Sequence, residues 1–294
     1  MKKVFIIAAA GLAALACSKG TVAPDGTCRQ IAIQASIGPM SKVATTGLTA
    51  VFESGDKVSL FAWTGSAAAV GTPLVVDGVK NTLGTDGKWT PESPMLWADM
   101  VSPHYFIGVS PARRVTDFKA DAFTLDPADY EAGDLLIATN VAGLKAQDNP
   151  VSLAFDHVTA KLNVNLTFRS QWNSEPAVTA VTVTAKKTAT VDYLAKSLTA
   201  TGTAAPVALT STANNAWSGL QVPQEGVRAI TVVVDGKNYV YTHTADIPLS
   251  GGKFTTVNLT VGRDRIELSD EIVISDWTSQ GGVIDGDAEE EDQP

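Results

Sequence analysis

The stretch Leu162-Asn163-Val164-Asn165-Leu166-Thr167-Phe168 decides the fold class of this 294-residue chain. Apolar and polar side chains alternate at every step along it. In an extended backbone successive side chains point to opposite faces, so all the apolar groups lie on one side. The stretch therefore predicts a β-strand with one face in a core and the other toward solvent.

The same period of two recurs near both ends of the chain and in its middle, at residues 31–36, 181–184 and 256–261. Turn dipeptides separate the apolar runs, and Asp235-Gly236 between two of them is typical of a β-hairpin. No amphipathic stretch is long enough for a helix of four turns. Short strands joined by glycine-rich turns predict an all-β fold built from β-sandwiches.

The length of 294 residues favours two domains. A polar stretch ends at Asn149-Pro150 and a new strand begins at Val151, so we place the boundary near residue 158. The predicted division is an N-terminal β-sandwich over residues 29–158 and a C-terminal β-sandwich over 159–280. Residues 281–294 are strongly acidic, which predicts a solvated tail outside both sandwiches.

The first 16 residues have the pattern of a secretory signal peptide. Two lysines precede an apolar core that is too short to cross a bilayer comfortably. Cys17 follows Leu15-Ala16 directly, which resembles a bacterial lipoprotein signal, in which this cysteine is acylated and becomes the mature N-terminus. The alternative is an ordinary cleaved signal with a chance cysteine. Residues 17–28 then form a polar tether to the folded body.

The formal net charge is −9, and loss of the signal with its two lysines makes the mature chain more acidic. This argues against a nucleic-acid partner, which would require a basic patch. It also leaves the attachment to a membrane to an acyl anchor on Cys17 rather than to charge. With Cys17 acylated, Cys28 has no partner, so disulfides do not hold the fold together.

No pattern of catalytic or metal-binding residues emerges from the sequence, and we predict no catalytic residue, no metal and no cofactor. His104, His157 and His243 are far apart and lack partners at metal-ligand spacing. Ser54-Gly55-Asp56-Lys57 matches a Ser-x-x-Lys pattern, but a strand and not a helix is predicted around it. The six tryptophans either anchor the cores or form a platform for a sugar.

An ordered set of short motifs covers nearly the whole chain after the signal. The most specific is Phe52-Glu53-Ser54-Gly55-Asp56-Lys57-Val58-Ser59-Leu60-Phe61-Ala62, and further motifs lie at residues 29–33, 133–138, 153–162, 222–224, 252–261 and 272–277. Together with the lipoprotein-like start, this set resembles the fimbrillin family of the Bacteroidetes. The resemblance implies two transthyretin-like β-sandwich domains in tandem and a non-enzymatic role as a fimbrial subunit or tip adhesin. It also implies an outer-membrane lipoprotein at the cell surface.

The resemblance further implies assembly by exchange of strands between subunits. Many family members are cut by a protease after a basic residue near the first strand, and Lys42 is that residue here. The cut would remove the strand that carries Ile31, Ile33 and Ala35. We expect the replacement strand to come from the C-terminal region of a neighbouring subunit, where the apolar candidates are Ile272, Ile274, Val283 and Ile284.

The predicted partners are therefore other fimbrial subunits, the outer membrane through the lipid anchor, and a host or bacterial surface ligand. Two other functions remain as alternatives. A monomeric surface lipoprotein that binds glycans would present exposed coplanar aromatic side chains. An enzyme would need polar groups that converge in a cleft, which the sequence does not show.

Overall fold

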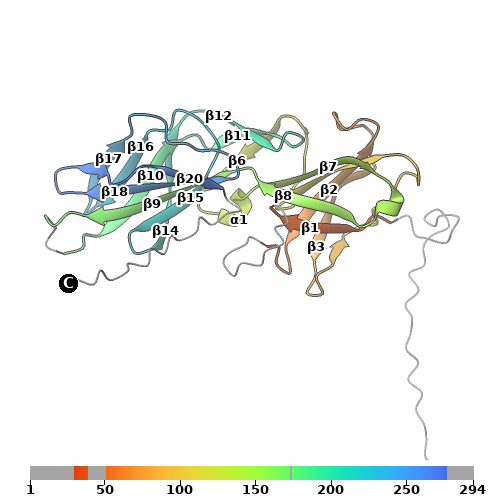
Figure 1. Cartoon of the computed structure of the whole chain (residues 1–294), viewed down its shortest axis with the longest axis horizontal. Helices are drawn as coiled ribbons and strands as arrows, with labels where there is room; N and C mark the ends of the chain where they lie inside the picture. Colours follow the sequence, from red (N-terminus) through yellow and green to blue (C-terminus); the bar gives the residue numbers. More distant parts are fainter. Residues whose placement is uncertain (1–29, 39–50, 173, 277–294) are drawn as a thin grey trace, which may run out of the picture.

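The computed structural model describes residues 30–38, 51–172 and 174–276. Strands make up most of these residues, as Figure 1 shows. Within the described ranges, helix is confined to one turn of α-helix, α1 (Tyr130–Gly133), and one 3-10 turn, η1 (Ala146–Asp148). The predicted all-β class is confirmed.

The first sheet has seven strands in the order β1-β8-β7-β5-β2-β3-β4. The pairing of β1 with β8 is parallel, and the other pairs are antiparallel. The strands are β1 (Ile33–Ile37), β2 (Lys57–Thr64), β3 (Val76–Leu83), β4 (Trp89–Pro91), β5 (His104–Ser110), β7 (Leu136–Leu144) and β8 (Val151–His157).

Both faces of this seven-stranded sheet are covered. Strand β2 sends Leu60 into one hydrophobic cluster and Phe61 into another, and both side chains are at most 1% exposed. We call the cluster under β1 the inner cluster; it includes Ile31, Leu60, Met95 and Phe155. Burial of both faces explains the nearly continuous apolar run of β2, since a strand with no solvent side has no need to alternate.

A small three-stranded sheet lies over the opposite face and encloses what we call the outer cluster, which includes Phe61, Ile107, Phe123 and Val191. Its order is β12-β11-β6, and β6 pairs with β11 in antiparallel fashion although the two are far apart in sequence. Figure 1 shows this sheet between the two ends of the molecule. Its strands are β6 (Asp121–Thr124), β11 (Thr188–Asp192) and β12 (Ser197–Thr201).

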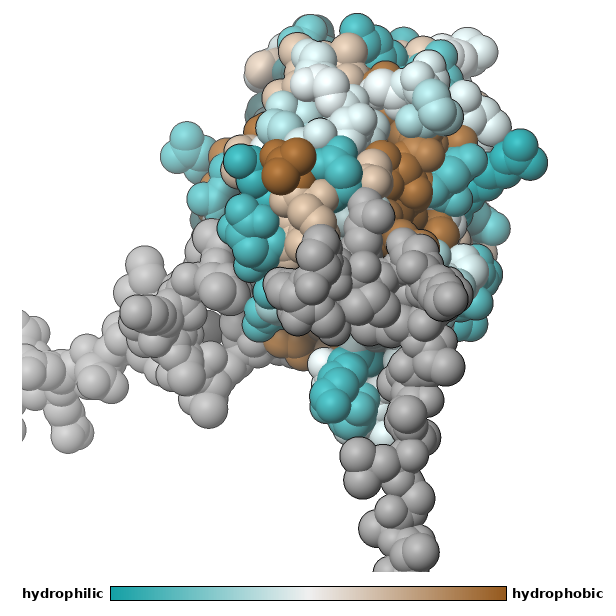
Figure 2. All heavy atoms as spheres, turned by 90° about the vertical axis from the view of Figure 1, so that its right-hand side faces the viewer, coloured by the Kyte–Doolittle hydropathy of each residue, from teal (hydrophilic) through white to brown (hydrophobic). Residues whose placement is uncertain are grey.

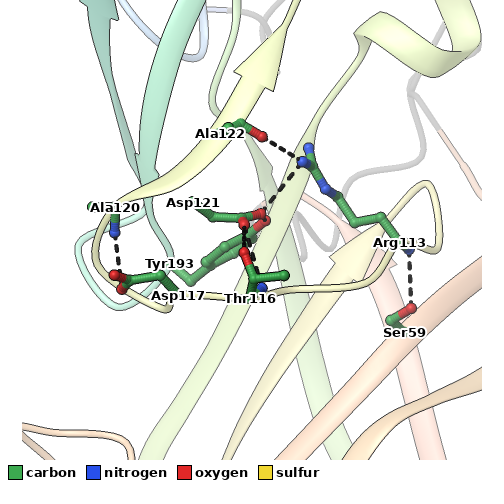
Figure 3. Close-up of polar contacts among 8 residues, drawn as sticks. All are labelled: Ser59, Arg113, Thr116, Asp117, Ala120, Asp121, Ala122 and Tyr193. Carbon is green, nitrogen blue, oxygen red and sulfur yellow. Dashed lines mark hydrogen bonds and ion pairs between the residues drawn. The ribbon is translucent and has the colours of Figure 1, made fainter.

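A polar network fixes the end of the three-stranded sheet (Figure 3). The buried carboxylate of Asp121 accepts hydrogen bonds from the Thr116 hydroxyl at 2.8 Å and the Tyr193 hydroxyl at 2.8 Å, and pairs with Arg113 at 3.3 Å. Burial by itself raises the pKa of Asp121, but the hydrogen bonds from Thr116 and Tyr193 outweigh it, so that the pKa lies below its usual value. Burial also raises the pKa of Tyr193, which keeps its hydroxyl protonated as the donor.

The remaining strands form a β-sandwich. A four-stranded sheet in the order β13-β10-β16-β17 packs on a six-stranded sheet in the order β14-β15-β9-β18-β19, in which β20 also pairs with β18. These strands are β9 (Ala160–Phe168), β10 (Val178–Ala185), β13 (Ala205–Ala208), β14 (Thr210–Ala213), β15 (Ala216–Gln221), β16 (Ala229–Val234), β17 (Lys237–Thr242), β18 (Lys253–Val261), β19 (Ile266–Leu268) and β20 (Val273–Asp276).

The alternating stretch predicted as a strand is β9. Leu162 and Val164 are 0% exposed and Leu166 is 4% exposed, whereas Asn165 between them is exposed. The predicted hairpin is also confirmed, since β16 and β17 flank Asp235 and Gly236, whose φ angles of 48° and 77° are those of a tight hairpin turn.

The predicted boundary near residue 158 lies between β8, in the seven-stranded sheet, and β9, in the sandwich. Contacts nevertheless cross this point, because β6 pairs with β11. The division into domains over 29–158 and 159–280, and their transthyretin-like form, stay predictions.

Candidate functional site at the first strand

The first strand, β1, lies at the edge of the seven-stranded sheet beside β8. The register places Ile33 opposite Val151 and Ala35 opposite Leu153. Just before β1, the amide of Ile31 donates to the Met95 carbonyl at 2.7 Å, which ties the start of the strand to the chain that follows β4. An edge strand with this few neighbours can leave without breaking the ladders of the other six.

The inward side chains of this segment are apolar and cover the inner cluster. Ile31 is 1% exposed and Ile33 is 7% exposed, whereas Ala32 between them is exposed. Ala35 and Ile37 pack on the same cluster and are partly buried. Burying one such isoleucine contributes about 1.5–3 kcal/mol, so loss of the segment would uncover an apolar trough above Leu153 and Phe155.

The side chain of Asn149 binds the main chain of the same segment. Its Oδ1 accepts from the Ala32 amide at 2.9 Å, and its Nδ2 donates to the Gln30 carbonyl at 3.2 Å. Next along β8, the Val151 amide donates to the Ala32 carbonyl at 2.8 Å. The segment is thus held through its backbone at its start, by the side chain of Asn149 as well as by main-chain bonds to Met95 and Val151.

Figure 2 shows the end of the molecule where β1 starts, with hydrophobic groups set among hydrophilic ones. At the other end of β1, a cleft of a size common among ligand pockets adjoins Ile37. It measures about 610 Å³ and is lined by the apolar Phe52 and Leu136 and by the charged Glu53 and Asp134, among others.

The structure brings the predicted strand residues Ile31, Ile33 and Ala35 together on one apolar face. The C-terminal candidates lie elsewhere: Ile274 is 44% exposed on β20, opposite Thr255 of β18, and Ile272 packs against the sandwich core. Several predicted positions lie outside the described residues: the predicted lipidation residue Cys17, the predicted cleavage residue Lys42, and also Cys28, Val283 and Ile284.

The three histidines lie in separate hydrogen-bonded places. His104 is buried; its Nε2 accepts from the Ala98 amide at 3.0 Å, so its Nδ1 donates to the Ser102 carbonyl at 2.9 Å. His157 pairs with Asp134 at 2.8 Å, and His243 with the Tyr241 hydroxyl at 2.5 Å. Across residues 30–38, 51–172 and 174–276, no three His, Cys, Asp or Glu side chains gather where they could hold a metal ion.

Asn149 is the residue of this site that sequence reasoning missed. We read Asn149-Pro150 as the end of a polar stretch, although an Asn-Pro pair directly before a strand is also a position where the side chain of asparagine caps local backbone. Among residues 30–38, 51–172 and 174–276, no helix has the length and apolar character needed to cross a bilayer.

Comparison with known proteins places this geometry in a family. A family model described as fimbrillin-like matches residues 42–277. No curated protein matches the sequence. Among solved structures, a candidate cell adhesion protein from Bacteroides uniformis is 18% identical with a TM-score of 0.65, over 87% of this chain and 99% of its own.

Two further solved structures share the fold. A candidate cell adhesion protein from Bacteroides ovatus is 15% identical with a TM-score of 0.66, over 84% of this chain and 97% of its own. A fimbrial protein from Bacteroides vulgatus is 15% identical with a TM-score of 0.52, over 85% of this chain and 99% of its own.

Proposed function

This chain belongs to the fimbrillin-like family, and we propose that it is a fimbrial subunit or tip adhesin that assembles by exchange of its first strand. The role is structural and adhesive, not enzymatic. In this proposal the chain is exported as a lipoprotein with Cys17 acylated, and it reaches the cell surface through the outer membrane.

The observation that carries the proposal is the position of β1. It lies at a sheet edge, yet Ile31 and Ile33 are nearly fully buried in the inner cluster. A sheet that loses such a strand exposes unpaired backbone groups and an apolar trough, and a strand from another chain can restore both. While its own β1 occupies the place, a subunit cannot accept another strand.

The proposed trigger is a cut after Lys42, the one basic residue between Arg29 and Lys57. The replacement strand would come from the C-terminal region of a neighbour, with Ile272, Ile274, Val283 and Ile284 as its apolar candidates. The contact joins two different surfaces of successive subunits, so it gives open filaments and not closed dimers.

The test is limited digestion of the purified mature chain with a lysine-directed protease, with particle size followed by light scattering. We expect the chain cut at Lys42 to form larger particles, and the Lys42→Ala variant to stay intact at this site and monomeric. Monomers of both forms, after complete cleavage of the parent at Lys42, would refute strand exchange by this route.

A second candidate function is glycan binding by a monomeric surface protein. The observation that favours it is an open cleft of roughly 400 Å³, in the usual range for ligand pockets, at the edge of the sandwich. Trp217 lines it, and Glu175 there accepts hydrogen bonds from Asn214 and Asn215. An aromatic ring beside amide and carboxylate groups suits a sugar ring with its hydroxyls. Loss of binding to a glycan array in Trp217→Ala, in a protein that stays monomeric after cleavage, would favour this function.

A further inference from the structure

We propose that Asn149 recognises the main chain of whichever strand occupies the place of β1, so that it selects an incoming strand by its backbone. This inference rests on the proposed exchange of strands. It assigns to Asn149 a positioning role at the start of the groove, and it specifies the strand that the groove accepts.

The register of β8 explains why a side chain is useful at this point. In a parallel pair, every second residue of a strand bonds to the same neighbour, and Val151 is such a residue, since its amide donates to the Ala32 carbonyl at 2.8 Å. The preceding residue of that series is Asn149, which lies before the start of β8. Its carboxamide supplies both a donor and an acceptor, and thereby extends the ladder by one step beyond the end of β8.

The two bonds of Asn149 carry no information about side chains, because both partners are backbone atoms, of Gln30 and Ala32. They do fix the register and the direction. The strand must run parallel to β8, and the residue in the place of Ala32 must have an N–H. At the far end, the Gly38 amide donates to the Phe155 carbonyl at 2.7 Å, so the strand is held by its backbone at both ends.

Side-chain selection comes from the inner cluster alone. The residues in the places of Ile31 and Ile33 enter it almost completely, and the residue in the place of Ala32 faces solvent. The partner is therefore an extended segment with aliphatic residues two apart and any residue except proline between them. A charged residue at either aliphatic place would be excluded by the cost of its burial.

The test uses the complete mature chain cut at Lys42, so that β1 is no longer joined covalently to the sheet and can be displaced, and a fluorescent peptide of residues 29–38 as the incoming strand. A second peptide has an ester in place of the amide between Ile31 and Ala32, which removes the N–H that Asn149 accepts. A third has proline in the place of Ala32. Binding of each is measured with the parent, with Asn149→Ala and with Asn140→Ala, whose amide donates to the Ser152 carbonyl of the same sheet at 3.1 Å.

With the parent and with Asn140→Ala, we expect the ester to weaken binding about tenfold, as loss of a hydrogen bond of about 1.4 kcal/mol does, and the proline peptide not to bind. With Asn149→Ala, the ester peptide and the unmodified peptide should bind with equal affinity. An ester penalty that is unchanged in Asn149→Ala would overturn the recognition by Asn149, since a merely structural role alters both peptides alike.

If no peptide enters the parent, strand exchange itself fails, and the role of Asn149 is then decided on the uncut chain. Amide hydrogen exchange at Ala32 should be at least tenfold faster in Asn149→Ala than in Asn140→Ala. Equal exchange rates in the two variants would show that Asn149 does not hold the segment.

Discussion

The absence of a side chain at Gly108 leaves room for the ring of Phe155: a Cβ on Gly108 would lie 2.6 Å from Cζ of that ring. The two residues are on different strands, β5 and β8, with β7 between them. The ring of Phe155 therefore reaches across a neighbouring strand and lies over the bare backbone of Gly108. Because Phe155 is also the partner of Ile37 in the β1 register, this packing shapes the floor under the first strand.

The first prediction concerns this close approach. Gly108→Ala should lower the free energy of unfolding by about 1–3 kcal/mol, the usual cost of overpacking a core. Phe155→Leu frees space at the cost of some packing, so the double variant should lose less stability than the sum of the two single losses. Urea unfolding of the four proteins measures this. Simple additivity would mean that the two residues do not compete for space.

The second prediction concerns the hydroxyl that Tyr193 donates to Asp121. Tyr193→Phe should cost about 1.5–3 kcal/mol, because it removes a hydrogen bond to a buried charged group and leaves the carboxylate with fewer donors. The matched control is Tyr239→Phe, whose hydroxyl donates to the Arg263 carbonyl at an exposed place. Thermal or urea unfolding of both variants checks the difference, and equal losses would contradict it.

The third prediction is the pH dependence that follows from Asp121. Its pKa is lower in the folded chain than the usual 3.8, so its ionised form stabilises the fold above the unfolded pKa. This contribution is lost as the pH falls through the folded pKa. Asp121→Asn should therefore be less stable than the parent at pH 7, and the gap should narrow on acidification below about pH 4.

Urea midpoints of Asp121→Asn at a series of pH values measure that gap. Asp77→Asn, at an exposed carboxylate of β3, is the control and should follow the parent throughout. A gap between the parent and Asp121→Asn that stays constant from pH 7 to pH 3 would mean that the network in Figure 3 does not hold a charged carboxylate.

The fourth prediction compares the two faces of β9. Leu166→Ala should cost about 2–5 kcal/mol, since it leaves a cavity in the sandwich core. Asn165→Ala removes an exposed side chain that donates to Asn258 at 2.9 Å, and it should cost about 1 kcal/mol or less. Urea unfolding curves of the two variants measure these losses of stability. Similar losses would argue against a strand with one buried and one exposed face.

The fifth prediction concerns the proposed anchor. Cys17→Ala should leave the protein without acyl chains, because the acceptor thiol is gone. The measurement is partition between detergent and aqueous phases after expression in a bacterium that acylates lipoproteins. If the variant enters the detergent phase as the parent does, the lipoprotein assignment is wrong. Cys28→Ala is the control and should partition as the parent does.

The half-buried strands were predictable because their signal is local. Leu162 and Val164 alternate with polar residues, and Asp235-Gly236 has the chemistry of one turn type, so each stretch of sequence specifies its own conformation. For the same reason the apolar face of Ile31 and Ile33 could be predicted from the sequence, and both side chains are buried in the structure.

The three-stranded sheet over one face of the seven-stranded sheet could not be predicted, because it depends on pairing between distant segments. In β6 and β11, Phe123 lies opposite Ala189, and neither short strand carries a signal for the other. Asn149 escaped notice for a related reason. Its proposed role depends on hydrogen bonds to Gln30 and Ala32, which are 119 and 117 residues away along the chain. Sequence spacing does not predict such a contact.

The pairing of β6 with β11 also constrains when the chain can fold during synthesis. A chain that emerges from its N-terminus first presents all seven strands of the first sheet by residue 157, yet the hairpin that covers their outer cluster ends at residue 201. Until then Ile107 and Val109 of β5 lack the hairpin above them. The early part of the chain thus keeps an apolar face uncovered until the later part has emerged, and at that stage a chaperone would have a surface to bind.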